Sequence, residues 1–209
     1  IEYIRAWKRS GKDRIQLFED TEFQQGFLLS YPSPSKGRAV EAVLKMGESK
    51  SKPVWRLCQW ATKHSLANVN PTKNNMGGMT CRNEGKSVTV GAPNFPSVDL
   101  ILEIKGDAEY GQSARKPGQA WPHLLVEQDT TKIRTLDTLD ALDLSIDFKL
   151  LYCKNNMPPS DYDPNLHAAQ FQLFLIIKNV EETSKDFGNF FWFGVPFFDS
   201  RHDIPPAFV

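Results

Sequence analysis

The sequence lacks an excess of charge of either sign, since 25 Lys and Arg residues stand against 25 Asp and Glu residues. Nucleic-acid-binding proteins draw their affinity from cationic side chains that neutralise phosphates, and membrane-surface modules use a polybasic patch. A formal net charge of zero argues against both classes, so we expect no nucleic-acid partner. Long apolar runs are also missing: the densest, Phe171–Ile177, is far shorter than the roughly 18 residues of a membrane span, and no span is expected.

Cysteine is scarce, and the three cysteines have no metal-site spacing. Cys58, Cys81 and Cys153 form no Cys-x-x-Cys pair, and an odd number makes a poor disulfide framework. We expect all three to be small buried hydrophobic residues. A single Cys58–Cys81 bridge is the alternative, and the redox compartment stays open.

Short catalytic motifs are absent as well. The chain has no Gly-x-Ser-x-Gly, no Gly-x-x-x-x-Gly-Lys-Ser/Thr, no Gly-x-Gly-x-x-Gly and no His-Glu-x-x-His. Their absence excludes the hydrolases, nucleotide enzymes and zinc proteases that such motifs mark. Glycan enzymes built on β-sandwiches remain, because their functional residues come from separate strands.

What the sequence does contain is apolar and polar residues in alternation. Leu142–Tyr152, Val98–Lys105 and Gln170–Lys178 show this period of two, which is typical of strands with one buried face. Phe190–Phe198 is a further apolar run, and it should end, bulge or lie at an edge at Pro196, which cannot donate to a ladder. Shorter strand candidates are Tyr3–Arg9, Gly26–Tyr31, Ala39–Leu44, Val54–Gln59, Ser87–Val90 and Leu124–Gln128.

Many strands with Gly- and Pro-rich turns between them and little helix predict an all-β fold. We expect one antiparallel two-sheet sandwich of the jelly-roll or concanavalin-like type over residues 1–209. The chain starts at Ile1 with no initiator Met or signal peptide, and we expect it to be a fragment of a longer protein. The predicted core comprises Leu100, Leu102, Leu144, Ile146, Phe148, Phe171, Leu173, Leu175 and Phe193.

The segment 121–129 combines an aromatic ring, an imidazole and two carboxylates. If it is extended, Trp121, His123, Glu127 and Asp129 lie on one face. Two carboxylates so placed approach the separation of roughly 5–5.5 Å used in retaining glycoside hydrolysis. We therefore predict Glu127, Asp129 and His123 as the catalytic residues of an enzyme; the alternative is that both carboxylates simply face water.

The same segment resembles part of a known glycosidase strand. Glu127-Gln128-Asp129 is similar to the first half of the Glu-x-Asp-x-x-Glu strand of laminarinase-type sandwich glycosidases. The last Glu of that strand is missing, and Lys132 stands nearby instead. The resemblance is too short to name a family.

A polysaccharide lyase is the second enzymatic hypothesis. Its chemistry needs a base and a cation or amide that neutralises a uronate carboxylate. His123 and His167 are the candidate bases. The candidate proton donors are Tyr110 and Tyr152, and the candidate neutralising groups are Arg56, Arg115, Gln170 and Gln172.

Polar strand faces suggest binding without catalysis. Planar amides and carboxylates read sugar hydroxyls, and a Trp ring stacks on a pyranose. The predicted ligand-binding residues are Trp121, Gln170, Gln172, Asp147 and Lys149. The sequence thus predicts a domain that binds or cleaves a polysaccharide or oligosaccharide in an extracellular or periplasmic protein. The alternative is a non-catalytic structural or protein-interaction domain.

Calcium is the one cofactor that the sequence suggests. Asp161, Asp163 and Asn165 offer oxygens at alternate positions, as at the start of a calcium loop. Leu166 replaces the glycine and Gln172 the glutamate that an EF-hand needs, so any such site would be a structural calcium site of another kind. The same residues are equally good turn formers.

Overall fold

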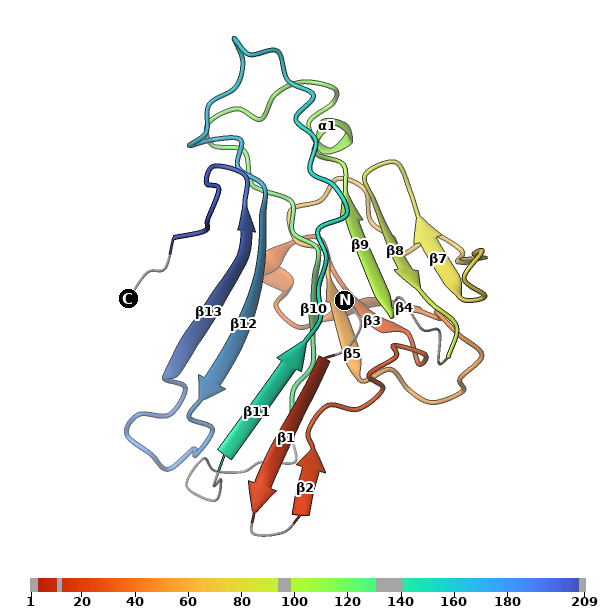
Figure 1. The fold of residues 1–209 in the computed structure, drawn as a ribbon, viewed down its shortest axis with the longest axis vertical. Coiled ribbons are helices and arrows are strands. Elements are labelled where there is room, and N and C mark those ends of the chain that lie inside the picture. The colour runs from red at the N-terminus through yellow and green to blue at the C-terminus, as the bar shows by residue number, and fades with distance from the viewer. Residues whose placement is uncertain (1–3, 11–12, 94–98, 131–140, 207–209) are drawn as a thin grey trace. The chain divides into compact units, whose positions relative to one another are not determined.

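The computed structural model describes residues 4–10, 13–93, 99–130 and 141–206, and these form an all-β protein (Figure 1). Helical structure in this part of the chain is confined to α1 (Gly106–Glu109) and a 3₁₀ turn at Pro34–Lys36, which confirms the prediction of little helix. None of the helices described is long and apolar enough to cross a membrane. The strands are β1 (Ile4–Ser10), β2 (Asp13–Gln16), β3 (Phe27–Ser30), β4 (Val40–Leu44), β5 (Trp55–Cys58), β6 (Thr72–Lys73), β7 (Met79–Arg82), β8 (Lys86–Val90), β9 (Leu100–Ile104), β10 (Leu125–Glu127), β11 (Ala141–Ile146), β12 (Gln170–Lys178) and β13 (Phe190–Asp199).

The chain divides into two compact units. The first consists of Ile1–Ser113 and Gly118–Lys149, and the second of Ala114–Pro117 and Leu150–Val209. The prediction of one domain stays a prediction, because two compact units can belong to a single domain.

The strands of the first unit form three sheets, in the orders β11-β1-β2, β10-β5-β3-β4 and β6-β7-β8-β9. Neighbours within them pair antiparallel, except that β3 and β5 run parallel. A fourth sheet, β12-β13, belongs to the second unit. Several antiparallel sheets therefore bear out the all-β class, while the two-sheet jelly roll stays a prediction.

The two four-stranded sheets of the first unit share one hydrophobic core. β3 supplies Phe27 and Leu29, and β8 supplies Val88 and Val90, all of them fully buried in one cluster. Because side chains alternate across a strand, the residues between the buried positions of β3 point to the opposite face of the sheet. Burying each large apolar side chain stabilises the fold by about 1.5–3 kcal/mol.

The register of β10, β5 and β3 determines which side chains lie on the sheet face opposite the core. Arg56 of β5 lies opposite Glu127 of β10 on one side and beside Leu28 of β3 on the other. Their neighbours Trp55 and Leu57 face the core. A charged pair is therefore placed on the sheet face that points away from the core cluster.

The second unit is built around a hairpin whose register contains a bulge. Phe171 pairs with Phe198, whereas Gln172 pairs with Pro196, so β13 carries one extra residue next to the proline. This confirms the expectation that the strand is irregular at Pro196, since proline has no N–H to donate.

The predicted core is only partly confirmed. Leu100 is 2% exposed, but Phe193 is 59% exposed and Phe148 is 44% exposed, so these two predictions are wrong. Phe193 lies on β13, whose sheet has only two strands, and Phe148 follows the end of β11. The remaining residues are half-buried: Leu102, Leu144, Ile146, Phe171, Leu173 and Leu175.

The cysteines also correct an expectation. Cys58 and Cys81 are buried free thiols, as small hydrophobic residues would be, and the alternative Cys58–Cys81 bridge is absent from the structure. Cys153 is exposed, so the prediction of burial is wrong there. It lies in an irregular segment between β11 and β12, outside any sheet.

Candidate functional site

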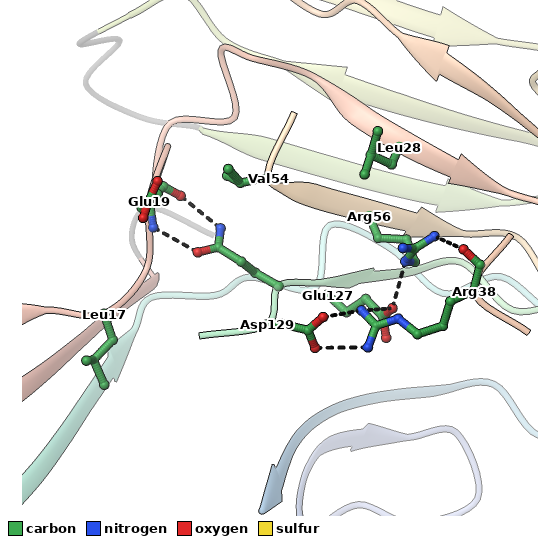
Figure 2. Close-up of a pocket in the computed structure, with 9 residues that line it drawn as sticks. Leu17, Glu19, Leu28, Arg38, Val54, Arg56, Glu127 and Asp129 are labelled. Atoms are coloured by element: carbon green, nitrogen blue, oxygen red, sulfur yellow. Dashed lines mark hydrogen bonds and ion pairs between the residues drawn. The ribbon is translucent and has the colours of Figure 1, made fainter. Parts of the chain in front are cut away.

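A pocket of about 350 Å³ lies in the first unit beside the end of β10 (Figure 2). This size is in the range of small-molecule sites. Charged and polar side chains line it together with three aliphatic ones. The lining residues are Leu17, Glu19, Leu28, Arg38, Val54, Arg56, Glu127, Gln128 and Asp129, and we call this the arginine–carboxylate pocket.

Glu127 is held in the pocket by two arginines. Nε of Arg56 lies 3.1 Å from Glu127 Oε1, and Nη2 of Arg38 lies 3.4 Å from the same oxygen. The Arg56 side chain is largely buried, whereas those of Arg38 and Glu127 are partly exposed. Nη1 of Arg56 also donates to the Arg38 carbonyl oxygen at 2.7 Å, which links β5 to the loop before β4.

Asp129 forms a bidentate pair with Arg38. Nη1 and Nη2 of Arg38 donate to the two Asp129 carboxylate oxygens at 3.0 and 2.5 Å. The hydrogen bond to Asp129 raises the pKa of Arg38 and, together with the negative charges of Asp129 and Glu127, outweighs the lowering effect of burial. Such fork-to-fork pairs fix geometry as well as charge.

Gln128 closes one side of the pocket through the backbone of Glu19. Its side-chain Oε1 accepts from the Glu19 N–H at 2.8 Å, and its Nε2 donates to the Glu19 carbonyl at 2.9 Å. Figure 2 draws both of these bonds to Glu19 as dashed lines. The amide thereby fastens the segment after β2 to the end of β10.

The structure brings two of the predicted catalytic residues together and leaves the third outside. Glu127 and Asp129 both contact Arg38, as the shared-face hypothesis requires. His123 does not line the pocket: its backbone N–H donates to the Trp60 carbonyl oxygen at 2.9 Å, and the centroids of the His123 and Trp60 rings lie 6.4 Å apart in an edge-on arrangement. Trp121, the predicted stacking ring, is half-buried and also lies outside the pocket lining.

The other predicted binding residues lie away from the pocket lining. Asp147 and Lys149 are exposed and belong to the first unit, while Gln170 and Gln172 belong to the second. Nε2 of Gln170 donates to Asp199 at 2.8 Å. Asp199 also pairs with Arg201 at 2.5 Å; that hydrogen bond holds the pKa of Asp199 well below its usual range, against the effect of burial.

His167, a candidate lyase base, has both ring nitrogens engaged. Nδ1 accepts from the backbone N–H of Asp163 at 2.9 Å, and Nε2 lies 2.8 Å from the Arg115 carbonyl oxygen. Because Nδ1 accepts a hydrogen bond, the ring proton lies on Nε2, which donates it to the Arg115 carbonyl oxygen. The imidazole therefore ties Ala114–Pro117 to the loop before β12.

The predicted calcium residues form turns. Asp163 Oδ1 accepts from the Asn165 N–H at 2.9 Å, and Asp161 Oδ1 is 2.9 Å from the Ser160 hydroxyl. In the part of the chain that the structure describes, no three His, Cys, Asp or Glu side chains gather as metal ligands would. A structural calcium ion stays a prediction.

A buried polar cluster that the sequence analysis missed lies elsewhere in the first unit. Lys86 of β8 and Glu109 of α1 are both fully buried, and Lys86 Nζ lies 3.0 Å from Glu109 Oε1. The Thr62 hydroxyl donates to Glu109 and accepts from Lys86, and the Lys63 N–H donates to Glu109 at 2.7 Å. These hydrogen bonds give both buried charged groups partners within the protein. The Lys86–Glu109 pair therefore connects α1 to the sheet that contains β8.

Arg38 is the pocket arginine that sequence reasoning missed altogether. It follows Gly37 in a polar turn segment, just before the strand candidate Ala39–Leu44. Arg56 was considered only as a group that would neutralise a uronate, yet its partner is Glu127. The only available signal was that two strand candidates, 54–59 and 124–128, carry opposite charges.

We compared the chain with protein-family models, with curated proteins and with solved structures, and none of the three comparisons found a match.

Proposed function

We propose that the domain binds a saccharide in the arginine–carboxylate pocket. The observation that carries the proposal is the paired network of Arg38, Arg56, Glu127 and Asp129 on the pocket wall. Planar guanidinium and carboxylate groups with fixed orientation suit hydroxyl recognition, because a hydroxyl both donates and accepts. Leu28 and Val54 add aliphatic surface for the carbon skeleton of a sugar ring.

The ion pairs of Glu127 and Asp129 with arginine favour saccharide binding over saccharide cleavage. Glycoside hydrolysis by two carboxyl groups needs one of them to protonate the leaving oxygen and the other to attack or to activate water. Both Glu127 and Asp129 are engaged with arginine, and protonating either one would break an ion pair. A hydrolase or lyase activity is therefore the less supported version of the same proposal.

The setting that fits this function is a two-sheet sandwich of jelly-roll type in an extracellular or periplasmic protein. Its support is the all-β architecture, with two four-stranded sheets that share a core. Ligand sites on such folds commonly use polar side chains of a sheet face and the loops at its ends.

Affinity electrophoresis on gels that contain a broad panel of polysaccharides tests the proposal. We expect retention on at least one glycan and a loss of affinity of tenfold or more in Glu127→Gln and Arg38→Met. The matched control is Glu103→Gln, which removes a carboxylate paired with Arg82 at 3.4 Å outside the pocket. That control should keep wild-type retention.

Assays of the same mixtures for reducing ends and for the ultraviolet absorbance of unsaturated uronates distinguish binding from cleavage. New reducing ends alone would indicate a hydrolase, and added absorbance a lyase. No retention and no product on the whole panel would contradict saccharide binding.

A second candidate function, protein interaction, rests on the hairpin β12–β13. Phe190, Phe191, Trp192 and Phe193 are consecutive and each is more than half exposed. Exposed apolar surface of this kind often marks an interaction site. Sedimentation that shows association of the wild type but not of Trp192→Ser, with no glycan retained by either, would favour this function.

A further inference from the structure

The charge balance and the open hydrogen-bonding positions of the arginine–carboxylate pocket indicate a class of ligand. We infer that the pocket takes an uncharged sugar residue through two neighbouring hydroxyl groups and selects against uronate and sulfate groups. This inference rests on the proposed saccharide binding and specifies the ligand for that site.

Carboxylates outnumber guanidinium groups in the lining. Arg38 and Arg56 carry the positive charges, and Glu19, Glu127 and Asp129 carry the negative ones. Asp129 already neutralises one edge of the Arg38 guanidinium, so an anionic group would have to compete with Asp129 for that charge and would still lie near the remaining carboxylates. Like charges about 4 Å apart in a wet site lower affinity by roughly fivefold to tenfold.

Two hydrogen-bonding positions remain open on neighbouring strands. Glu127 uses Oε1 for both arginines, and among the described residues its Oε2 has no partner. Arg56 Nη1 donates to the Arg38 carbonyl oxygen, and Nε forms an ion pair with Glu127 Oε1 but no hydrogen bond. Its Nη2 has no hydrogen bond or ion pair within the same part of the chain. Because Glu127 and Arg56 are opposite each other in the β10–β5 register, an acceptor and a donor stand side by side.

Vicinal hydroxyl groups match this arrangement. One hydroxyl donates to Glu127 Oε2, and its neighbour accepts from Arg56 Nη2. The ion pairs hold both groups in place before the ligand arrives, which reduces the entropy lost on binding. A carboxylate or sulfate offers acceptors only, so it leaves Glu127 Oε2 without a donor.

Polymer pairs that differ only in charge test the inference. Polygalacturonate and its carboxyl-reduced form, and a neutral glucan and its C6-oxidised form, are compared by affinity electrophoresis at low and high salt. We expect the uncharged member of at least one pair to bind about tenfold more tightly, with the difference shrinking at high salt because screening weakens repulsion. Asp129→Asn should narrow the difference, and Glu103→Gln should leave it unchanged.

The outcomes separate this inference from the proposed function. Tighter binding of the charged member, abolished by Glu127→Gln, would overturn the inference and leave saccharide binding intact. Equal binding of both members would also overturn it. Retention of neither member of any pair, nor of any other glycan, would overturn both.

Discussion

Burial gives the three cysteines different reactivities. Burial raises the pKa of Cys58 to about 12, aided by the charge of Glu127, and raises that of Cys81 to about 11. A thiol reacts as its thiolate, so these two are protected by both protonation and inaccessibility. Cys153 is exposed, although partial desolvation raises its pKa as well.

We therefore predict that a thiol-specific reagent at pH 8 labels one cysteine per folded chain and three in denaturant. Cys153→Ser should abolish labelling of the folded protein. Rapid labelling of Cys58 or Cys81 in that variant would contradict the buried positions of β5 and β7.

At the scale of elements, one ion pair connects α1 to the sheet of β8. α1 has only four residues, of which only Glu109 is buried, so the Glu109 contacts are the buried interactions that hold it. Removing one member of a buried pair costs about 3–5 kcal/mol, because the other charge is left buried and unpaired, whereas replacing both members costs far less. Glu109→Gln should thus lower stability by about that amount, and Lys86→Met with Glu109→Gln by less than half of it, as measured by urea unfolding.

The same pair predicts how stability depends on pH. Burial alone would raise the pKa of Glu109, but hydrogen bonds from Thr62, from the Lys63 backbone and from Lys86 outweigh it and lower the pKa below the ordinary 4.5. A carboxyl whose folded pKa is lower than its unfolded pKa contributes stability at neutral pH and loses it as the pH falls through and below that ordinary range. Melting temperatures from pH 7 to pH 3 should fall less steeply in the double variant than in the wild type; equal slopes would contradict the assignment.

At the scale of the whole molecule, the two units are stabilised differently. The first unit buries aromatic and aliphatic side chains between two four-stranded sheets, whereas the described sheet of the second unit is a single two-stranded hairpin with exposed aromatic residues. A single two-stranded hairpin is marginally stable in water. Amide protection follows local stability.

Hydrogen exchange should therefore be uneven along the chain. We expect amides of β3, β5 and β8 to exchange at least 100-fold more slowly than those of β12 and β13, as measured by mass spectrometry of the intact chain. Equal protection would indicate that the hairpin is covered in solution, by a partner or by another part of the protein.

Several elements were predictable from sequence because their signal is local. Gln170–Lys178 has an apolar residue at every second position, and β12 has the predicted bounds. The irregularity at Pro196 follows from its missing N–H. The strands at Met79–Arg82 and Asp13–Gln16 were missed. Each has only four residues, which is too few to show a clear alternation of apolar and polar side chains.

The site was predictable only in part. Glu127 is the last residue of β10 and Asp129 lies two residues further along, so their proximity could be inferred from this spacing. Their partners could not, because Arg38 lies 91 residues before Asp129 in the sequence. No local pattern encodes such a contact.

By itself, then, the sequence determined the all-β class, the little helix, and the segment in which two carboxylates come together, since each depends on the alternation of side chains along one strand. Only the tertiary structure decided which strands are neighbours, and so placed Arg56 opposite Glu127 and Arg38 against Asp129. It also decided which strands are buried: β3 contributes to the core cluster, whereas Phe190, Phe191, Trp192 and Phe193 of β13 are each more than half exposed. The physical reason is that strand propensity is a property of successive residues, whereas pairing, register and burial depend on contacts between residues distant in the chain.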